Sequence, residues 1–290
     1  MVKNLLMITV FIACLMFVSN KLQAETQRSL SISEHLMEAT FRIADNKSSG
    51  TVFIFGRPIK IQGKSGQIFI LVTAEHVLKN MPGDSAKIFM RYRRERGQWE
   101  RRDISVKIRS QGKPMWIKHP EVDVAVIPLS APSNVSIAAI PLSFLATDEK
   151  LREVGIRTGD EVLCLGYPLG SGSNQIGFPI LRSGRIASYP LLPTKETKTF
   201  LMDFHVFPGN SGGPVYISDP GPRLIANGIM FGKPAFFILG LVTREIKIPE
   251  RIQTMDSLEI RTHPLKIAEV IHASLIREAI EMIPIPSNLR

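Results

Sequence analysis

The sequence predicts an all-β protein built from two six-stranded antiparallel β-barrels and a C-terminal α-helix. Two series of short β-rich runs are separated by clusters of turn residues, as in barrel proteins. The pattern then changes to a helical period near the C-terminus. The 290 residues suffice for one large or two small domains. A stretch containing proline and serine, residues 128–141, separates the two series and indicates the connection between two lobes.

We place the first lobe at residues 40–135 and the second at residues 136–250. The strands expected in the first lobe are Thr51–Phe55, Gln67–Thr73, Ala86–Arg91, Ile104–Ile108 and Val122–Pro128. Those expected in the second are Glu161–Gly166, Ile180–Ser188, Thr199–Val206, Pro214–Tyr216, Leu224–Met230 and Phe236–Arg244.

The remaining segment, residues 251–290, has a helical pattern with Pro264 suited to the first turn. The residues that share one apolar face of this helix are Ala268, Ile271, Leu275, Ala279 and Met282. The pattern predicts a helix packed on the second barrel.

The first 24 residues have the layout of a secretory signal peptide. Lys3 precedes the uncharged apolar run Leu5–Val18, and cleavage after Ala24 fits best. That run is shorter than the roughly 20 residues of a membrane-spanning helix, although an uncleaved anchor stays open. A lipid on Cys14 fits less well, because apolar residues continue beyond it. We therefore expect an exported protein, periplasmic or secreted, without a stable membrane span once residues 1–24 are removed. Residues 25–39 are predicted as a polar N-terminal arm.

Removal of the leader leaves Cys164 as the only cysteine, in a run that indicates a buried strand. We expect a packed core thiol and no internal disulfide. No cysteine and histidine cluster has the spacing of a metal site, so we expect neither a metal nor another cofactor.

A basic run over residues 91–102 contributes to the net charge of +10. It predicts a strand hairpin that turns near Gly97 with solvated charges. The alternative is a patch for nucleic acid or anionic surfaces. Glu95 and Glu100 interrupt the run, so we expect no nucleic-acid partner. The sequence predicts no oligomeric state.

The segment 207–215, Phe-Pro-Gly-Asn-Ser-Gly-Gly-Pro-Val, suits a nucleophilic serine. Glycines around Ser211 permit a tight turn that exposes the hydroxyl and gathers backbone N–H groups. Such a serine needs a base and an orienting acid. His76 follows an apolar β-favouring run, and Asp123 precedes another.

The order His76, Asp123, Ser211, with the motifs Thr-Ala-Glu-His-Val, Asp-Val-Ala-Val and Gly-Asn-Ser-Gly-Gly-Pro, resembles the chymotrypsin-fold serine proteases. The resemblance covers roughly residues 40–250 and is nearest to the bacterial trypsin-like branch that includes the HtrA/Deg proteases. It implies an exported serine endopeptidase that cleaves proteins or peptides between the two lobes. Too few residues follow the second lobe for the PDZ domain of the HtrA/Deg proteases, so we expect no peptide-gated regulation.

By the same resemblance, backbone N–H groups of Gly209 and Ser211 form the oxyanion hole. Asn210 stands where digestive relatives have an aspartate that pairs with a new N-terminus. We therefore expect activity without zymogen cleavage, with hydrogen bonds holding the loop. The resemblance places the substrate pocket at His205, Thr243 and Glu245. The pocket would take small apolar or acidic side chains, and Glu245 would narrow it.

Two alternative functions fit parts of the same pattern. The nucleophile elbow of α/β-hydrolases would use Asp256 and His272, but a strand and a turn follow Ser211 where a helix is required. We reject it. A catalytically weak protease-fold binding module, or a degenerate remnant, stays open.

Overall fold

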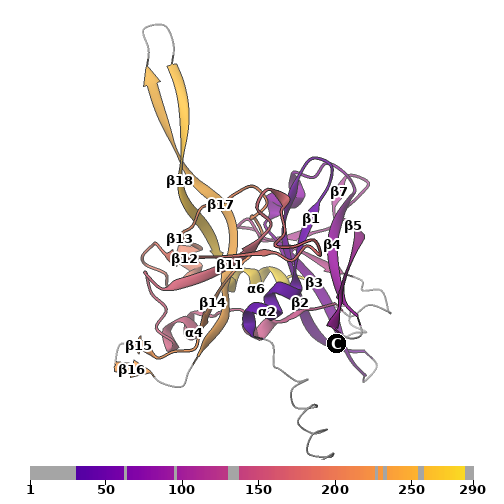
Figure 1. Ribbon diagram of the computed structural model, residues 1–290, viewed down its shortest axis with the longest axis horizontal. Coiled ribbons are helices and arrows are strands. Elements are labelled where there is room, and N and C mark those ends of the chain that lie inside the picture. The colour runs from indigo at the N-terminus through magenta and orange to yellow at the C-terminus, as the bar shows by residue number, and fades with distance from the viewer. Residues whose placement is uncertain are drawn as a thin grey trace, which may run out of the picture. The chain divides into compact units, whose positions relative to one another are not determined.

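The computed structural model describes residues 31–61, 64–94, 97–129, 137–225, 228–230, 234–253 and 258–284. The predicted leader and residues 25–30 of the predicted arm lie outside the described residues. Residues from Ile32 onward form one compact unit. The fold class is confirmed, because this unit consists mainly of strands, with a closed six-stranded barrel, a second sheet and few helices (Figure 1).

The first lobe is one large sheet with the order β5-β4-β1-β2-β3-β9-β8 and with β10 paired to β2. All neighbours along this path are antiparallel, whereas β10 is parallel to β2. The bounds are β1 (Thr40–Ala44), β2 (Ser49–Ile61), β3 (Lys64–Thr73), β4 (Ser85–Arg93), β5 (Trp99–Lys107), β8 (Ile117–Lys118), β9 (Ala125–Leu129) and β10 (Ile140–Pro141).

This sheet differs from the expected six-stranded barrel, because its hydrogen-bonded path has seven strands, with β10 as an eighth strand off that path, and does not close on itself. The chain between β5 and β8 forms a separate small hairpin of β6 (Arg109–Ser110) and β7 (Lys113–Pro114). Because β6 and β7 pair only with each other, β5 and β8, the two ends of the sheet, are not joined by hydrogen bonds.

The second lobe is the predicted closed antiparallel barrel, with the order β11-β12-β13-β18-β17-β14. Its strands are β11 (Glu161–Gly166), β12 (Ile180–Ile186), β13 (Thr199–Asp203), β14 (Pro214–Asp219), β17 (Ala235–Gln253) and β18 (Leu258–His272). Residues 224–230, predicted as a barrel strand, belong to a separate two-stranded hairpin of β15 (Arg223–Ile225) and β16 (Gly228–Met230).

The place of that strand in the barrel is taken by β18, which pairs with β13 and β17. The prediction of a helix from Pro264 is therefore wrong for Ala268 and Ile271, which lie on this strand. Within the barrel, buried Ala268 and Val270 alternate with the half-buried Glu269, a period of two. Ala268 and Ile271 are apolar strand residues whose spacing happens to match the helical pattern that begins at Ala273. The barrel extends beyond residue 250 to His272.

The helices are short. They are α2 (Ile32–Ala39), α3 (Glu75–Lys79), α4 (Asp148–Glu153), α5 (Thr194–Thr197) and α6 (Ala273–Glu281), with 3-10 turns η2 (Leu142–Phe144) and η3 (Pro168–Gly170). The C-terminal helix is thus present as α6. It contacts β17, β18 and also β9 of the first sheet. Leu275 and Ala279 are buried as predicted, whereas Met282, predicted on the same face, is 47% exposed.

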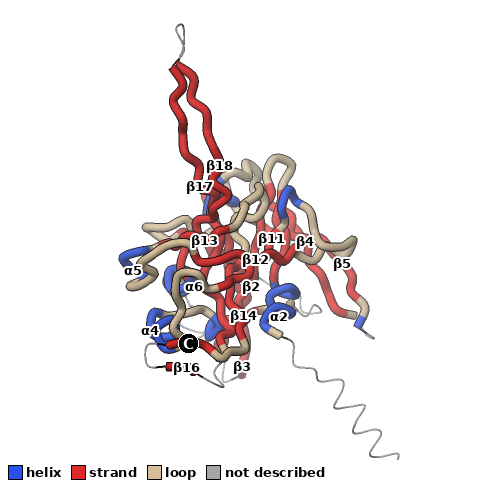
Figure 2. The backbone as a smooth tube through the Cα atoms, turned by 60° about the vertical axis from the view of Figure 1, so that its left-hand side comes forward, coloured by secondary structure: helices blue, strands red, loops and turns tan. Residues whose placement is uncertain are grey.

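The strands β17 and β18 remain paired far past the barrel, out to Gln253 and Leu258. Their outer part projects beyond the other strands (Figures 1 and 2). No helix among the described residues is long and apolar enough to span a bilayer.

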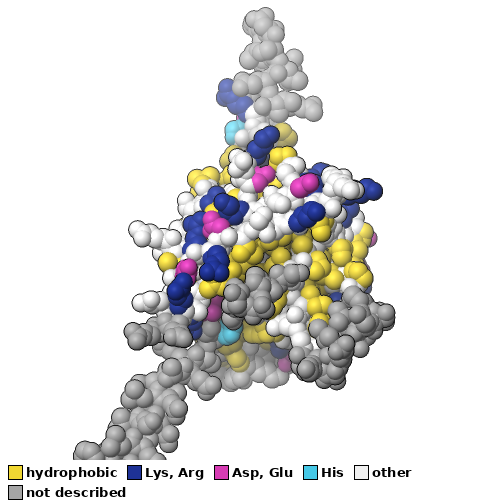
Figure 3. Space-filling view, turned by 90° about the vertical axis from the view of Figure 1, so that its right-hand side faces the viewer, with side chains coloured by type: hydrophobic (Ala, Val, Ile, Leu, Met, Phe, Trp, Pro, Cys, Tyr) yellow, Lys and Arg dark blue, Asp and Glu magenta, His cyan; other side chains and the backbone are white. Residues whose placement is uncertain are grey.

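The predicted basic hairpin is formed by β4 and β5, with Arg93 opposite Trp99. On the face seen in Figure 3, acidic side chains and apolar surface lie between the basic side chains. The expectation of solvated charge is wrong for Arg91, which is only 3% exposed. Its guanidinium donates to the Tyr167 hydroxyl (2.7 Å) and to the Gly177 carbonyl (2.6 Å) of the second lobe. Arg91 therefore joins the two lobes.

Candidate active site

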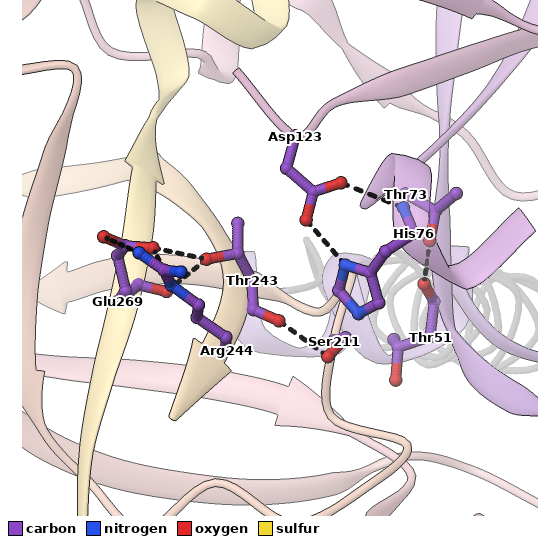
Figure 4. A network of polar contacts seen from close by, with 8 residues as sticks. All are labelled: Thr51, Thr73, His76, Asp123, Ser211, Thr243, Arg244 and Glu269. Atoms are coloured by element: carbon purple, nitrogen blue, oxygen red, sulfur yellow. Dashed lines mark hydrogen bonds and ion pairs between the residues drawn. The ribbon is translucent and has the colours of Figure 1, made fainter. Parts of the chain in front are cut away.

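The pairing of β3 with β9 brings His76 and Asp123 together. Thr73 at the end of β3 lies opposite Ala125 at the start of β9. His76 follows β3 on the first turn of α3, and Asp123 lies just before β9. The His76 Nδ1 atom is 2.6 Å from Asp123 Oδ2 (Figure 4). The strand-end positions predicted for both residues therefore place them in contact.

Two main-chain N–H groups hold Asp123 in this position, one at its carboxylate and one at its main-chain carbonyl. The His76 backbone N–H donates to Asp123 Oδ1 at 2.9 Å, and the Glu75 N–H donates to the Asp123 carbonyl at 3.4 Å. Burial alone raises the pKa of Asp123, but the hydrogen bond and charge of His76 and the backbone N–H groups outweigh it. The pKa of Asp123 therefore lies below its usual value, and the carboxylate stays ionised at neutral pH.

Ser211 lies in the turn between β13 and β14. Its hydroxyl donates to the carbonyl of Thr243 on β17 at 2.7 Å. Figure 4 shows Ser211 beside the His76 ring, with the serine hydroxyl hydrogen-bonded to the Thr243 carbonyl. Among the described residues, no hydrogen bond joins Ser211 to His76. The three predicted residues therefore lie near one another, but only His76 and Asp123 are hydrogen-bonded to each other.

Only glycine fits at position 209, for two reasons. Its φ is +98°, in the region that side chains disfavour. A Cβ would also lie 2.2 Å from the Tyr167 carbonyl oxygen. The Pro208 carbonyl accepts a hydrogen bond of 2.6 Å from the Leu169 N–H. Because a trans peptide group directs its N–H opposite its C=O, the Gly209 N–H points away from Leu169.

The N–H groups of Gly209 and Ser211 donate to no acceptor among the described residues. Both therefore remain available to an oxyanion. The carbonyls of the same two residues are held by Thr51 of β2, through its hydroxyl to Gly209 (2.7 Å) and its N–H to Ser211 (2.9 Å). The hydrogen bonds that we expected to hold this loop are thus identified.

Asn210 is 1% exposed, and its Oδ1 atom has no hydrogen-bond partner among the described residues. Its N–H donates to the Phe207 carbonyl at 3.0 Å, and its carbonyl accepts from Gly213 at 2.9 Å. The main chain of Asn210, not its side chain, supports the turn.

His205 and Glu245, both predicted to lie at the substrate pocket, face each other. His205 Nε2 is 3.3 Å from Glu245 Oε1. This distance fits an ion pair but not a hydrogen bond of good geometry, and Oε1 has no hydrogen-bond partner among the described residues. The His205 ring also stacks on Phe207, with 4.3 Å between ring centroids. The sequence indicated each residue but not their pairing.

Thr243, the third predicted pocket residue, presents its carbonyl to Ser211 and its hydroxyl to Glu269 (3.3 Å). Glu269 in turn accepts from Arg244 Nε at 2.7 Å. The sequence did not indicate Arg244, Glu269 or Thr51, because each acts through partners that are distant in the chain.

The buried Cys164 matches its prediction as a core residue, and desolvation raises its pKa to about 12. His272, the histidine of the rejected elbow, is 2% exposed. Burial lowers its pKa to about 4. Among the described residues, no group of three or more potential ligand side chains is placed to hold a metal ion.

The sequence profile of a family described as the trypsin-like peptidase domain matches residues 49–221, more than half of the chain. No curated protein matches the chain. Among solved structures, the chain is similar to the inactive form of a mutant of Rv3671c from M. tuberculosis H37Rv. That match has 15% identity and a TM-score of 0.43, and it covers 88% of this chain and 93% of the other. A likeness this distant carries no information on substrate.

Proposed function

Because the chain belongs to the trypsin-like peptidase family of chymotrypsin-fold serine proteases, we propose that it is an exported serine endopeptidase. It hydrolyses peptide bonds of protein or peptide substrates through His76, Asp123 and Ser211. The observation that carries the proposal is the 2.6 Å contact between His76 Nδ1 and Asp123 Oδ2. The hydrogen on Nδ1 then belongs to that contact, so Nε2 has its lone pair free for a proton.

The first step is attack by Ser211 on the substrate carbonyl. The hydroxyl leaves the Thr243 carbonyl by rotation about its Cα–Cβ bond and gives its proton to His76 Nε2. Asp123 stabilises the imidazolium and keeps the ring in orientation. The oxygen of the substrate carbonyl becomes an oxyanion, which the N–H groups of Gly209 and Ser211 bind. Each such donor contributes about 3 kcal/mol in comparable sites.

His76 then protonates the leaving amine, and an acyl-enzyme on Ser211 remains. Water attacks this ester with His76 again as the base, which releases the carboxylic acid and restores the serine. Each proton taken from a nucleophile is thus returned to a leaving group, and no further group is consumed.

A fluorophosphonate probe tests this proposal, because it reacts with an activated serine whatever the substrate. The protein without residues 1–24 should be labelled, and Ser211→Ala and His76→Ala should abolish labelling. His263→Ala is a matched control, since His263 is a half-exposed histidine that pairs with Glu250 on the projecting hairpin. Equal labelling of wild type and His76→Ala would overturn the proposal.

The export proposal rests on residues 1–24 and needs its own experiment. The full chain, produced in a bacterial host with a periplasm, should be recovered there with an N-terminus at Glu25. Mass spectrometry of the intact protein measures this. Recovery of the full-length chain in the cytoplasm would contradict export, and a full-length chain in the membrane fraction would indicate the anchor.

A second candidate is a protease-fold binding module with little turnover. Two observations favour it. The Ser211 hydroxyl is hydrogen-bonded to the Thr243 carbonyl, and Glu245, whose side chain is 11% exposed, pairs with His205, the other charged residue predicted for the pocket. A folded wild-type protein that resists the probe would favour this alternative.

A further inference from the structure

The oxyanion loop, residues 208–211, belongs to the second lobe but is held by a residue of the first. Thr51 on β2 is fully buried. Its hydroxyl donates to the Gly209 carbonyl at 2.7 Å and accepts from the Tyr167 N–H at 3.2 Å. Its own N–H donates to the Ser211 carbonyl at 2.9 Å. One residue thus holds two of the loop's carbonyls.

The two bonds restrain the peptide groups that follow the two N–H donors. Gly209 has no side chain to limit its backbone, so its peptide groups can reorient unless hydrogen bonds hold them. The peptide group before Gly209 is held by Leu169, and the group after it is held at its carbonyl by the Thr51 hydroxyl and at the Asn210 N–H by the Phe207 carbonyl. Without that hydroxyl, no hydrogen bond among the described residues reaches the Gly209 carbonyl.

The Thr51 hydroxyl is itself held in place by the lobe interface. Tyr167, which donates its N–H to Thr51, receives a hydrogen bond on its hydroxyl from the buried Arg91. Arg91 lies on β4 and Thr51 on β2, so two strands of the first sheet are hydrogen-bonded to Tyr167, the residue just before η3. Hydrogen bonds from the first lobe, which also carries His76 and Asp123, therefore fix the position of the oxyanion loop.

We propose that Thr51 is a positioning residue of the active site, whose hydroxyl orients the Gly209 peptide so that the oxyanion hole is formed before substrate binds. This inference rests on the proposed peptidase function. It adds a hydroxyl from the other lobe to the support that the Asn210 main chain gives the turn, whereas Asn210 Oδ1 has no hydrogen-bond partner among the described residues. Thr51 touches no substrate in this account and acts only through the loop.

The test compares Thr51→Val, which removes the hydroxyl at nearly constant shape, with Thr51→Ser, which keeps it. The rate of fluorophosphonate labelling should fall roughly 10- to 100-fold in Thr51→Val, less than the 10²–10³-fold cost of losing a donor outright. Thr51→Ser should restore most of the rate. Once a peptide substrate is known, the loss should appear in kcat with KM little changed.

Thr40→Val is the matched control. Thr40 is an equally buried threonine on the neighbouring strand β1, and its hydroxyl has no partner among the described residues. Its replacement should leave the labelling rate unchanged. A rate in Thr51→Val equal to that of wild type would overturn the inference.

Hydrogen exchange tests the positioning without any activity. Mass spectrometry of a peptide spanning residues 207–213 should show faster exchange in Thr51→Val than in wild type, Thr51→Ser or Thr40→Val. Unchanged exchange in Thr51→Val overturns the inference whether or not the wild type reacts with the probe. Failure of the folded wild type to react overturns only the proposed peptidase function.

Discussion

Two histidine–carboxylate pairs lie in the predicted site and pocket, and they differ in how the carboxylate is held. In the pair of His76 and Asp123, the nearest atoms are 2.6 Å apart, and both side chains are 36% exposed. In the pair of His205 and Glu245, the distance is 3.3 Å, and the glutamate side chain is only 11% exposed. Backbone N–H groups bind Asp123, whereas Glu245 Oε1 has no hydrogen bond among the described residues.

The difference shows that contact between an imidazole and a carboxylate does not by itself make a catalytic pair. Main-chain donors fix Asp123, so its one remaining oxygen can fix the ring of His76. Glu245 Oε1 has no such hydrogen bond among the described residues, and its only polar contact there is the ion pair with His205. The following predictions test this distinction.

The largest effect is expected from Asp123→Asn, which breaks the pair of His76 and Asp123, the pair whose carboxylate is held by a backbone N–H. The amide cannot accept from Nδ1 while also accepting from the backbone with the same geometry, so the ring loses its tautomer. We expect about a 10⁴-fold loss in the labelling rate with the fold intact by circular dichroism. A loss of less than tenfold would mean that this pair has no special role.

Asn210→Asp places a carboxylate at a position where, among the described residues, no imidazole is hydrogen-bonded to the native side chain. Because Asn210 is buried with an unpartnered Oδ1, the new charge is uncompensated and should cost about 3 kcal/mol of unfolding free energy at pH 7. Burial raises the pKa of the introduced carboxyl, so the deficit should shrink as the pH falls. Urea unfolding at pH 7 and pH 5 measures both effects. Asn174→Asp, at an exposed position, should change stability by far less, and an equal change in both variants would contradict this account.

His272 forms no ion pair or hydrogen bond with a carboxylate in the part of the chain that the structure describes, and its ring is hydrogen-bonded to the Thr197 hydroxyl (3.2 Å). Its pKa in the folded state is about 4, below that of the unfolded chain. The unfolded state therefore binds the extra proton first, and stability is lost as the pH falls from about 6.5 to about 4, by about 3 kcal/mol in full.

His272→Gln should flatten this part of the stability curve, measured by urea unfolding between pH 7 and pH 4. His263→Gln, at an exposed histidine, should leave the slope of the wild type. If His272→Gln retains that slope, the buried imidazole does not control it.

The smallest effect is expected from Glu245→Gln, which removes the negative charge from the pair of His205 and Glu245. The labelling rate should change by less than about tenfold, and peptide hydrolysis should respond in KM more than in kcat. Steady-state kinetics with peptides that differ at the residue before the cleaved bond measure this. A thousandfold fall in kcat would place Glu245 in the catalytic machinery and remove the distinction between the two pairs.

Local patterns were enough to predict the positions of His76, Asp123 and Ser211, because each lies at a strand end or a glycine turn. They could not predict Thr51, since its partners Tyr167 and Gly209 come from the other lobe. They also failed for Arg91, whose burial depends on carbonyls of residues distant in the sequence. For β18, two buried strand residues happened to continue the period of α6, and only pairing with β13 and β17 distinguishes strand from helix.

The place of β18 in the barrel has a consequence for the order in which the protein matures during synthesis. The strand that lies between β13 and β17 emerges from the ribosome long after the segment that carries Ser211. Until residues 258–272 have been made, the barrel stays open and β17, which carries Thr243, lacks a neighbour on one side. The surroundings of the nucleophile thus cannot be completed without these residues, and a chain interrupted before residue 258 lacks the strand that closes the second lobe.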